Sequence, residues 1–152
     1  MRGGGTDGAQ DRRAAAPRDI LAGVHDLPER LVGAWRVERY DDRASVDDEW
    51  TETYGPTVDG LIVYHDSGSL SVQVAGSDGV FDGYFGTFTV VEITEHDGDT
   101  RGLLRHNIVA SSMPGLLTAD PARPFRIHGD TLILGDEETW RRICERVGRS
   151  AS

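Results

Sequence analysis

Residues 31–40 read LVGAWRVERY, in which a Gly-x-Trp motif opens an alternating segment. A matching segment, TWRRIC at residues 139–144, lies near the other end of the chain. A tryptophan at the start of the first strand of a small antiparallel barrel can plug its floor, with an arginine of the last strand stacked over the ring. Gly33 leaves room for this close approach. The two segments therefore predict a barrel that is sealed at one end by Trp35.

Between these two ends, short apolar or alternating runs are separated by Gly and Asp pairs, as in an all-β meander. The pair Gly129-Asp130, with apolar alternation on both sides, is typical of a two-residue hairpin. Sequential hairpins without a long helix favour a single up-and-down antiparallel β-barrel. We expect strands near 33–41, 49–55, 60–65, 69–75, 82–93, 101–110, 124–128, 131–135 and 138–144.

The domain organisation expected from the sequence is one barrel domain, residues 19–148, after a disordered tail, residues 1–18, which has no periodicity. Asp26-Leu27-Pro28-Glu29 is typical of a helix start, so a short helical plug is expected over 28–32. The proline-rich stretch 111–124 interrupts the rhythm of the strands. It is expected to be a loop across the open end, either a lid or an ordered connector.

Composition excludes several classes of function. The net charge of -10 argues against nucleic acid or an anionic membrane as partner. All 16 basic residues are arginine, so no lysine can form a Schiff base.

The single cysteine, Cys144, cannot form an intramolecular disulfide and is expected to be a packing residue. With no apolar leader or membrane-length run, a cytoplasmic location is expected. Arginine-only usage with many Ala, Gly and Asp residues is also associated with a high-GC bacterial source.

The spacing of chemistry-bearing residues predicts no metal and no cofactor. No His-x-x-x-His or Cys-x-x-Cys pair is present. No glycine-rich phosphate loop opens a helix, so the sequence indicates no binding site for the phosphates of a nucleotide. Ser111 and Ser112 follow His106 but lack a nucleophile elbow, which argues against hydrolysis through a covalent intermediate.

Four ordered motifs carry a resemblance to a known family, in addition to residues 31–40 and His106. These are Tyr54-Gly55-Pro56, GLIVY at 60–64, Ser71-Val72-Gln73 and YFGTFTV at 84–90. Over residues 31–144 the chain resembles the bacterial and fungal lipocalin-like domain family. The resemblance implies a calyx-like barrel that binds an apolar or amphipathic molecule. Some related barrels of natural-product biosynthetic clusters act as cofactor-independent cyclases, isomerases or dehydratases. After His106 the chain departs from the pattern of the family, with a longer and more proline-rich loop.

Individual residues add candidates for chemistry. Arg39 shares a strand face with Trp35, so it could grip a carboxylate, enol or phenolate inside the barrel, or pair with Glu52 or another internal acid. Tyr84 is expected to point inward on the same face as Phe88.

The histidine at position 106 is the best acid or base candidate in the sequence. It lies between Leu104 and Ile108, an apolar setting that lowers the pKa of the imidazole and keeps it neutral. The alternative is a core histidine whose nitrogen is satisfied by a neighbouring hydroxyl group.

The sequence thus predicts a cofactor-independent cyclase, isomerase or dehydratase that acts on an apolar, polyketide-like substrate inside the barrel. The alternatives are a non-catalytic carrier of a hydrophobic small molecule and, third, a haem-binding barrel with one axial histidine. The partner expected is a small molecule, and the protein is expected to be a monomer or a homodimer. The expected catalytic residues are His106 and Tyr84, and the expected substrate-binding residues are Trp35, Arg39, Tyr54, Tyr64, Gln73, Phe88, Ile108 and Met113.

Overall fold

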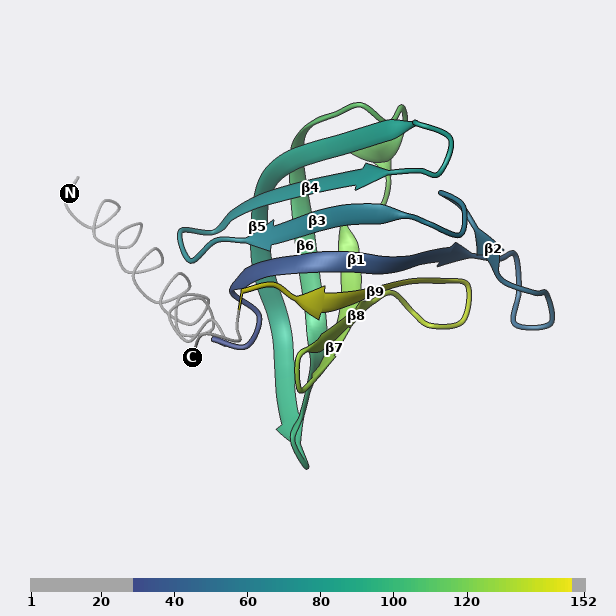
Figure 1. Cartoon of the computed structure of the whole chain (residues 1–152). Helices are drawn as coiled ribbons and strands as arrows, with labels where there is room; N and C mark the ends of the chain where they lie inside the picture. Colours follow the sequence, from purple (N-terminus) through teal and green to yellow (C-terminus); the bar gives the residue numbers. More distant parts are fainter. Residues whose placement is uncertain (1–28, 149–152) are drawn as a thin grey trace, which may run out of the picture.

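The structure, a computed structural model, describes residues 29–148 and is all-β (Figure 1). A single 3₁₀ turn, η1(Leu116–Thr118), is the one helical element of this range. The strands are β1(Gly33–Asp42), β2(Thr51–Glu52), β3(Asp59–Tyr64), β4(Ser69–Ala75), β5(Phe81–His96), β6(Asp99–Ser111), β7(Ala122–His128), β8(Thr131–Leu134) and β9(Trp140–Arg146).

The strands close into an antiparallel barrel, which confirms the predicted all-β antiparallel barrel. Neighbours follow the order β1-β3-β4-β5-β6-β7-β8-β9, and β9 pairs back with β1. Closure is possible because the long β1 meets β3 through residues 33–36 and β9 through residues 35–42. The two-residue β2 only extends the end of β1. Of the predicted strand 49–55, the structure has only residues 51–52 in a strand, whereas 69–75 is a strand as expected.

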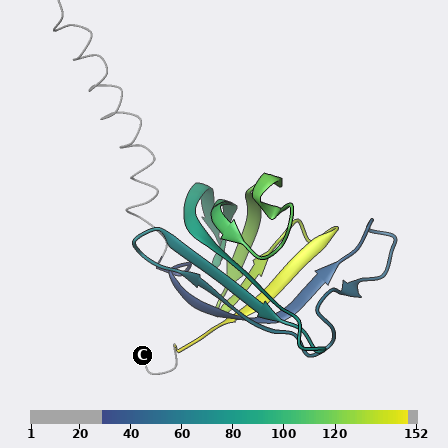
Figure 2. The same ribbon diagram turned by 90° about the horizontal axis from the view of Figure 1, so that it is seen from above.

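Strands β5 and β6 form the longest hairpin and turn the corner of the barrel. The first half of β5, residues 81–87, pairs with β4. The first half of β6, residues 99–105, pairs with β7, and β5 and β6 pair with each other along most of their length. Bulges between Phe85 and Gly86 and between Val90 and Glu92 allow this bend. In Figure 1, β1, β3 and β4 run across the front and β5 and β6 stand behind them, and Figure 2 shows the same arrangement from above.

The floor of the barrel forms as the Gly-x-Trp motif predicts. Trp35 is fully buried, and its indole N–H donates to the carbonyl of Leu31 at 2.9 Å. The guanidinium of Arg146, in the last strand, lies 4.2 Å from the centre of the Trp35 ring. Above them, the core is formed by Ile62, Tyr64, Leu70, Val72, Phe88, Val90, Leu104, Phe125, Ile127, Leu132, Leu134 and Cys144. The burial of Cys144 confirms the packing role expected of it.

The predicted helical plug is not supported. The predicted tail, residues 1–18, and residue 28 lie outside the described residues, and residues 29–31 form a turn. The carbonyl groups of this segment bind side chains: Leu31 accepts from Trp35, and Val32 accepts from Arg146 at 3.1 Å. Gly33 follows directly at φ 135°, outside the helical region, and β1 begins there. In the described range, no helix is long and apolar enough to cross a membrane.

Candidate functional site

A cavity of about 360 Å³ lies inside the barrel on the side away from Trp35. Most of its wall is apolar, and three polar side chains from different strands, Tyr84, Arg123 and Arg142, converge on it. A mostly apolar cavity with a few convergent polar groups is the usual form of a small-molecule site. The lining residues are Val37, Tyr40, Ile62, Val72, Val74, Tyr84, Met113, Leu116, Ala119, Asp120, Ala122, Arg123, Leu134, Trp140 and Arg142.

The proline-rich loop between β6 and β7 supplies one side of this cavity. Met113 and Leu116 line it, as the apolar underside expected from the sequence would do. Leu117, the next residue, is 57% exposed and faces solvent. The loop is thus part of the wall of the cavity. That it acts as a lid, and that it is an ordered connector, both stay predictions.

Three aromatic rings form a hydrogen-bonded chain that leads from the core to the cavity. The hydroxyl of Tyr64 lies 2.8 Å from Nε2 of His106, and the hydroxyl of Tyr84 lies 2.9 Å from Nδ1 of the same ring. Tyr64 and His106 are buried, whereas Tyr84 reaches the cavity. His106 therefore acts on the cavity only through Tyr84.

Burial sets the protonation states in this chain of rings. It lowers the pKa of His106 to about 3, and the positive charge of Arg123 lowers it further in the same direction. Burial also raises the pKa of Tyr84 to about 12, although Arg123 opposes this shift, and raises the pKa of Tyr64 well above its usual range. All three groups are neutral near pH 7. The sequence prediction of a neutral imidazole with a lowered pKa is confirmed.

The proton positions follow from the burial of Tyr64. Its hydroxyl is fully buried and, among the described residues, has His106 Nε2 as its hydrogen-bond partner. A buried O–H without an acceptor is costly, so Tyr64 donates to Nε2. The neutral imidazole then carries its proton on Nδ1 and donates to the Tyr84 oxygen. Tyr84 consequently has its own O–H free to donate into the cavity.

Arg123 lies beside this donor. Both side chains line the cavity, and the positive charge of Arg123 acts to lower the pKa of the Tyr84 hydroxyl against the effect of burial. Its Nη1 donates to the main-chain carbonyls of Asp120, at 2.8 Å, and Ala122, at 3.0 Å, which fixes the base of the guanidinium at the start of β7. The Tyr84 hydroxyl and the remaining guanidinium N–H groups form a pair of donors within one apolar cavity. Such a pair can bind an oxygen atom that carries or develops negative charge.

Arg142 reaches the same cavity but is engaged elsewhere. It pairs with the carboxylate of Asp42 at 3.2 Å and stacks 3.5 Å from the ring centre of Tyr40. Its Nη1 also donates to the carbonyl of Asp41 at 2.9 Å. These contacts make Arg142 a part of the wall that holds the aromatic side chains in position.

Asp120 is the carboxylate among the residues that line the cavity. It is exposed, at the rim, and its Oδ1 accepts the backbone N–H of Ala122 at 3.0 Å. Its second oxygen is the group of this lining set that can take up a proton from a molecule in the cavity.

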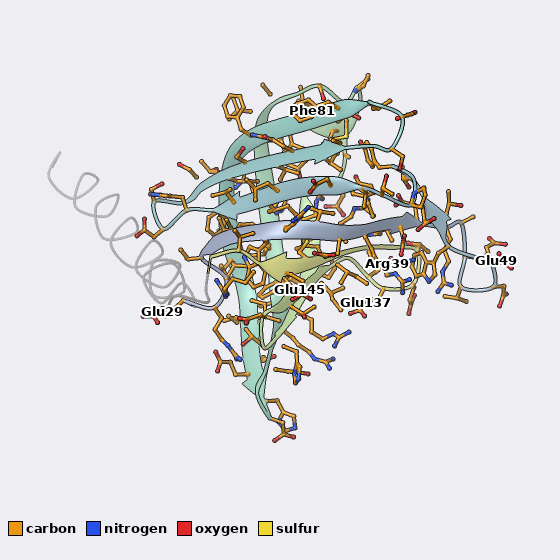
Figure 3. The ribbon with its side chains drawn as sticks, viewed as in Figure 1. Glu29, Arg39, Glu49, Phe81, Glu137 and Glu145 are labelled. Carbon is orange, nitrogen blue, oxygen red and sulfur yellow. The ribbon has the colours of Figure 1, made fainter. Side chains whose placement is uncertain are left out.

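Arg39, expected inside, lies outside the barrel, and its position corrects the prediction. A bulge between Val37 and Arg39 shifts the register of β1 against β9, which reverses the faces of the residues after it. Tyr40 thereby takes the inward position, and Arg39, labelled in Figure 3, pairs with the buried Asp41 at 3.0 Å. The alternative prediction for Arg39, an ion pair with an acidic residue, is confirmed, and its partner is Asp41 and not Glu52.

The other predicted site residues fall into three groups. Tyr84 and Met113 line the cavity. Trp35, Tyr64, Phe88 and His106 are buried in the core beneath it, and the inward direction expected of Phe88 is confirmed. Gln73 is exposed on the outer face, while Ile108 and Tyr54 are half-buried and do not line the cavity. The hydroxyl of Tyr54 donates to Asp82 at 2.8 Å.

Sequence reasoning missed the charged residues of the site, Arg123, Arg142 and Asp120. The sequence did carry a signal for the apolar part of the site. The alternation of Leu70, Val72 and Val74 in β4 correctly indicates an inward apolar face, but it does not locate the charged residues. The positions of the arginines depend on strand pairings that no local pattern encodes.

The structure shows no metal-binding cluster of three or more His, Cys, Asp or Glu residues within 29–148. Both nitrogens of His106 are bound by tyrosines and the ring does not line the cavity, so it does not fit the axial ligand of a haem. Comparisons with protein-family models, with curated proteins and with solved structures found no match for this chain. The resemblance to the lipocalin-like domain family therefore stays a prediction from its motifs.

Proposed function

We propose that the barrel binds a small, mostly apolar carbonyl compound of polyketide type and promotes its cyclisation, isomerisation or dehydration without a cofactor. The observation that carries this proposal is the neutral Tyr84 hydroxyl beside Arg123, both facing an apolar cavity of about 360 Å³. An oriented donor next to a cation stabilises the oxygen of an enolate, which is the common intermediate of these three reactions.

The proposed chemistry begins with the loss of a proton from the carbon next to a carbonyl group. The Asp120 carboxylate, or water at the rim, accepts this proton. The electron pair of the broken C–H bond moves to the carbonyl oxygen, where Tyr84 and Arg123 stabilise it. The enolate then has three outcomes, each of which uses the proton taken up by Asp120 or water. It attacks a second carbonyl carbon, whose oxygen takes that proton; or, when it is conjugated with a C=C bond, it takes that proton at the γ-carbon; or it expels a β-hydroxyl group, which takes that proton and leaves as water.

His106 has a positioning role in this scheme. Its imidazole accepts from Tyr64 and donates to Tyr84, so the Tyr84 hydroxyl is turned toward the cavity before the substrate binds. A donor that is already oriented requires little reorganisation during the reaction.

A hydrogen-exchange reaction tests the proposal without knowledge of the natural substrate. In D₂O, the protein is expected to accelerate deuterium incorporation at the α-carbon of 2-tetralone, followed by mass spectrometry. Tyr84→Phe should lower the acceleration by about 10² to 10³, the usual effect of removing one oxyanion donor. Tyr54→Phe is the matched control, because the Tyr54 hydroxyl does not line the cavity and binds Asp82 and the sulfur of Met113 instead. Equal rates for Tyr84→Phe and the wild type would refute the enzymatic role.

One observation favours the second candidate, a carrier of a hydrophobic small molecule. Among the residues that line the cavity, the one carboxylate, Asp120, stands at the exposed rim rather than deep inside. A carrier needs only the cavity. It would bind 2-tetralone without accelerating exchange, and native mass spectrometry of the purified protein would show a co-purified apolar molecule.

A further inference from the structure

Resting on the proposed function, we propose that the cavity selects apolar molecules that carry an anionic oxygen, a carboxylate or an ionised enol, which Arg123 and Tyr84 bind together. The apolar part of the molecule would lie along the wall formed by Val37, Ile62, Val72, Val74 and Leu134.

The first argument is the charge balance inside the cavity. Two guanidinium groups line it, and Arg142 is already paired with Asp42 at 3.2 Å. Arg123 forms no ion pair with any carboxylate of the described residues. Its guanidinium donates to the main-chain carbonyls of Asp120 and Ala122 and lies 5.8 Å from the centre of the Trp140 ring. The nearest acidic candidate, Asp120, points its Oδ1 to the backbone N–H of Ala122. The lining of the cavity therefore holds one guanidinium without a direct carboxylate partner, while the Asp120 carboxylate stands at the exposed rim.

The second argument is the solvation of that charge. Arg123 is half-buried at the edge of an apolar cavity. A guanidinium that has lost part of its water gains most from a partner that is itself charged and can accept two N–H donors, such as a carboxylate. A neutral ketone offers one acceptor and no charge.

The third argument is the direction of the Tyr84 hydroxyl. Because His106 donates to the Tyr84 oxygen, the Tyr84 proton is left for an acceptor in the cavity. A hydrogen bond from this hydroxyl to an anionic oxygen is stronger than one to a neutral acceptor. Both donors at this end of the cavity thus favour the same kind of atom.

The long-range charge of the chain acts in the opposite direction. At a net charge of -10, the protein as a whole repels an anion. If the protein prefers an anionic ligand, the preference must come from a cation in the cavity, because the net charge of the whole protein opposes it.

Two fluorescent probes with the same aromatic framework provide the test: N-phenyl-1-naphthylamine, which is neutral, and 8-anilino-1-naphthalenesulfonate, in which a sulfonate stands in for the anionic oxygen. The wild type is expected to bind the sulfonate with an affinity at least about tenfold higher than that of the neutral probe. Arg123→Met should reduce the ratio to about one while the affinity for the neutral probe is retained. Arg105→Met, which removes the same charge from an exposed position on the outer face of β6, should leave the ratio unchanged.

The possible failures are distinguishable. If the wild type binds neither probe, the proposed function fails and the inference falls with it. If the neutral probe binds as tightly as the sulfonate, or if Arg123→Met keeps the preference, the inference is overturned while the apolar site stands. A loss of the preference in Arg105→Met also overturns it. Arg123→Gln, which keeps hydrogen-bond donors without the charge, gives the same comparison should the methionine variant not fold.

Discussion

The guanidinium carbon of Arg146 lies 4.2 Å from the centre of the Trp35 ring and covers it at the floor of the barrel. The two residues come from strands β1 and β9, which are the first and the last strands of the barrel and pair with each other. Arg146 also donates to the carbonyls of Arg30 and Val32, so one side chain joins the chain ahead of β1 to β9.

We expect Arg146→Met to lower the free energy of unfolding by about 2 to 4 kcal/mol, because the variant loses a buried cation–π contact and leaves carbonyl groups without donors. Urea denaturation followed by circular dichroism measures this change. Arg36→Met is the matched control, since Arg36 pairs with Asp59 where both side chains are 60% exposed, and it should cost no more than about 1 kcal/mol. Equal losses in the two variants would contradict the structural role of Arg146.

His106 predicts a pH dependence of stability. Its pKa is lowered from 6.5 to about 3 on folding, so the unfolded chain binds a proton more readily than the folded one in this range. The free energy of unfolding should therefore fall as the pH drops below 6.5 toward 3, with a contribution of about 1.4 kcal/mol per pH unit. Urea titrations at several pH values, compared with His106→Gln, isolate this contribution. An identical slope in both proteins would show that His106 titrates normally.

The thiol of Cys144 is predicted to be unreactive in the folded protein. It is fully buried, and burial raises its pKa far above the ordinary value, so it remains protonated and inaccessible. A thiol-reactive disulfide reagent should modify the native protein only at the rate of unfolding, and rapidly in concentrated guanidinium chloride. Fast modification without denaturant, at a rate independent of added urea, would mean that the β8–β9 side of the barrel opens locally.

Asp136 predicts a stabilised turn before β9. Its Oδ1 accepts the N–H groups of Glu138, Thr139 and Trp140. Partial burial acts to raise its pKa, but these bonds and the Thr139 hydroxyl outweigh burial and lower the pKa to about 2. Asp136→Ala should lower the free energy of unfolding by about 1 to 2 kcal/mol. The contribution of the carboxylate is complete above the ordinary pKa of 3.8 and is lost as the pH falls through about 2. Glu95→Gln, at an exposed position, is the control for the loss of one negative charge, and a similar effect there would contradict the capping role.

Local patterns in the sequence were sufficient for most of the strands and for the floor, but not for 49–55, of which only residues 51–52 are strand. The alternation of Leu70, Val72 and Val74 places β4, and the pair Gly129-Asp130 forms the turn between β7 and β8, with Gly129 at φ 62°. The Gly-x-Trp motif correctly indicates which end of β1 is sealed. These features depend on residues close together in the chain, so the sequence displays them directly.

The charged part of the site could not be found in this way. The bulge after Val37 exchanges Arg39 for Tyr40 on the inner face, and nothing in the residues around it marks the extra position. Arg123 and Tyr84 line the same cavity because β6 pairs with both β5 and β7, which brings together residues that are far apart in the chain. Such contacts follow from the register of several strands at once.

The three tryptophans occupy very different surroundings. Trp35 is sealed under Arg146, Trp50 lies between the guanidinium groups of Arg43 and Arg141 at 3.9 and 4.2 Å, and Trp140 forms part of the cavity wall. A molecule that enters the barrel would touch one indole and leave the other two unaltered. The protein thus carries a built-in optical reporter: the emission of Trp140, isolated by replacing the other two indoles with phenylalanine, would register occupancy without any added dye.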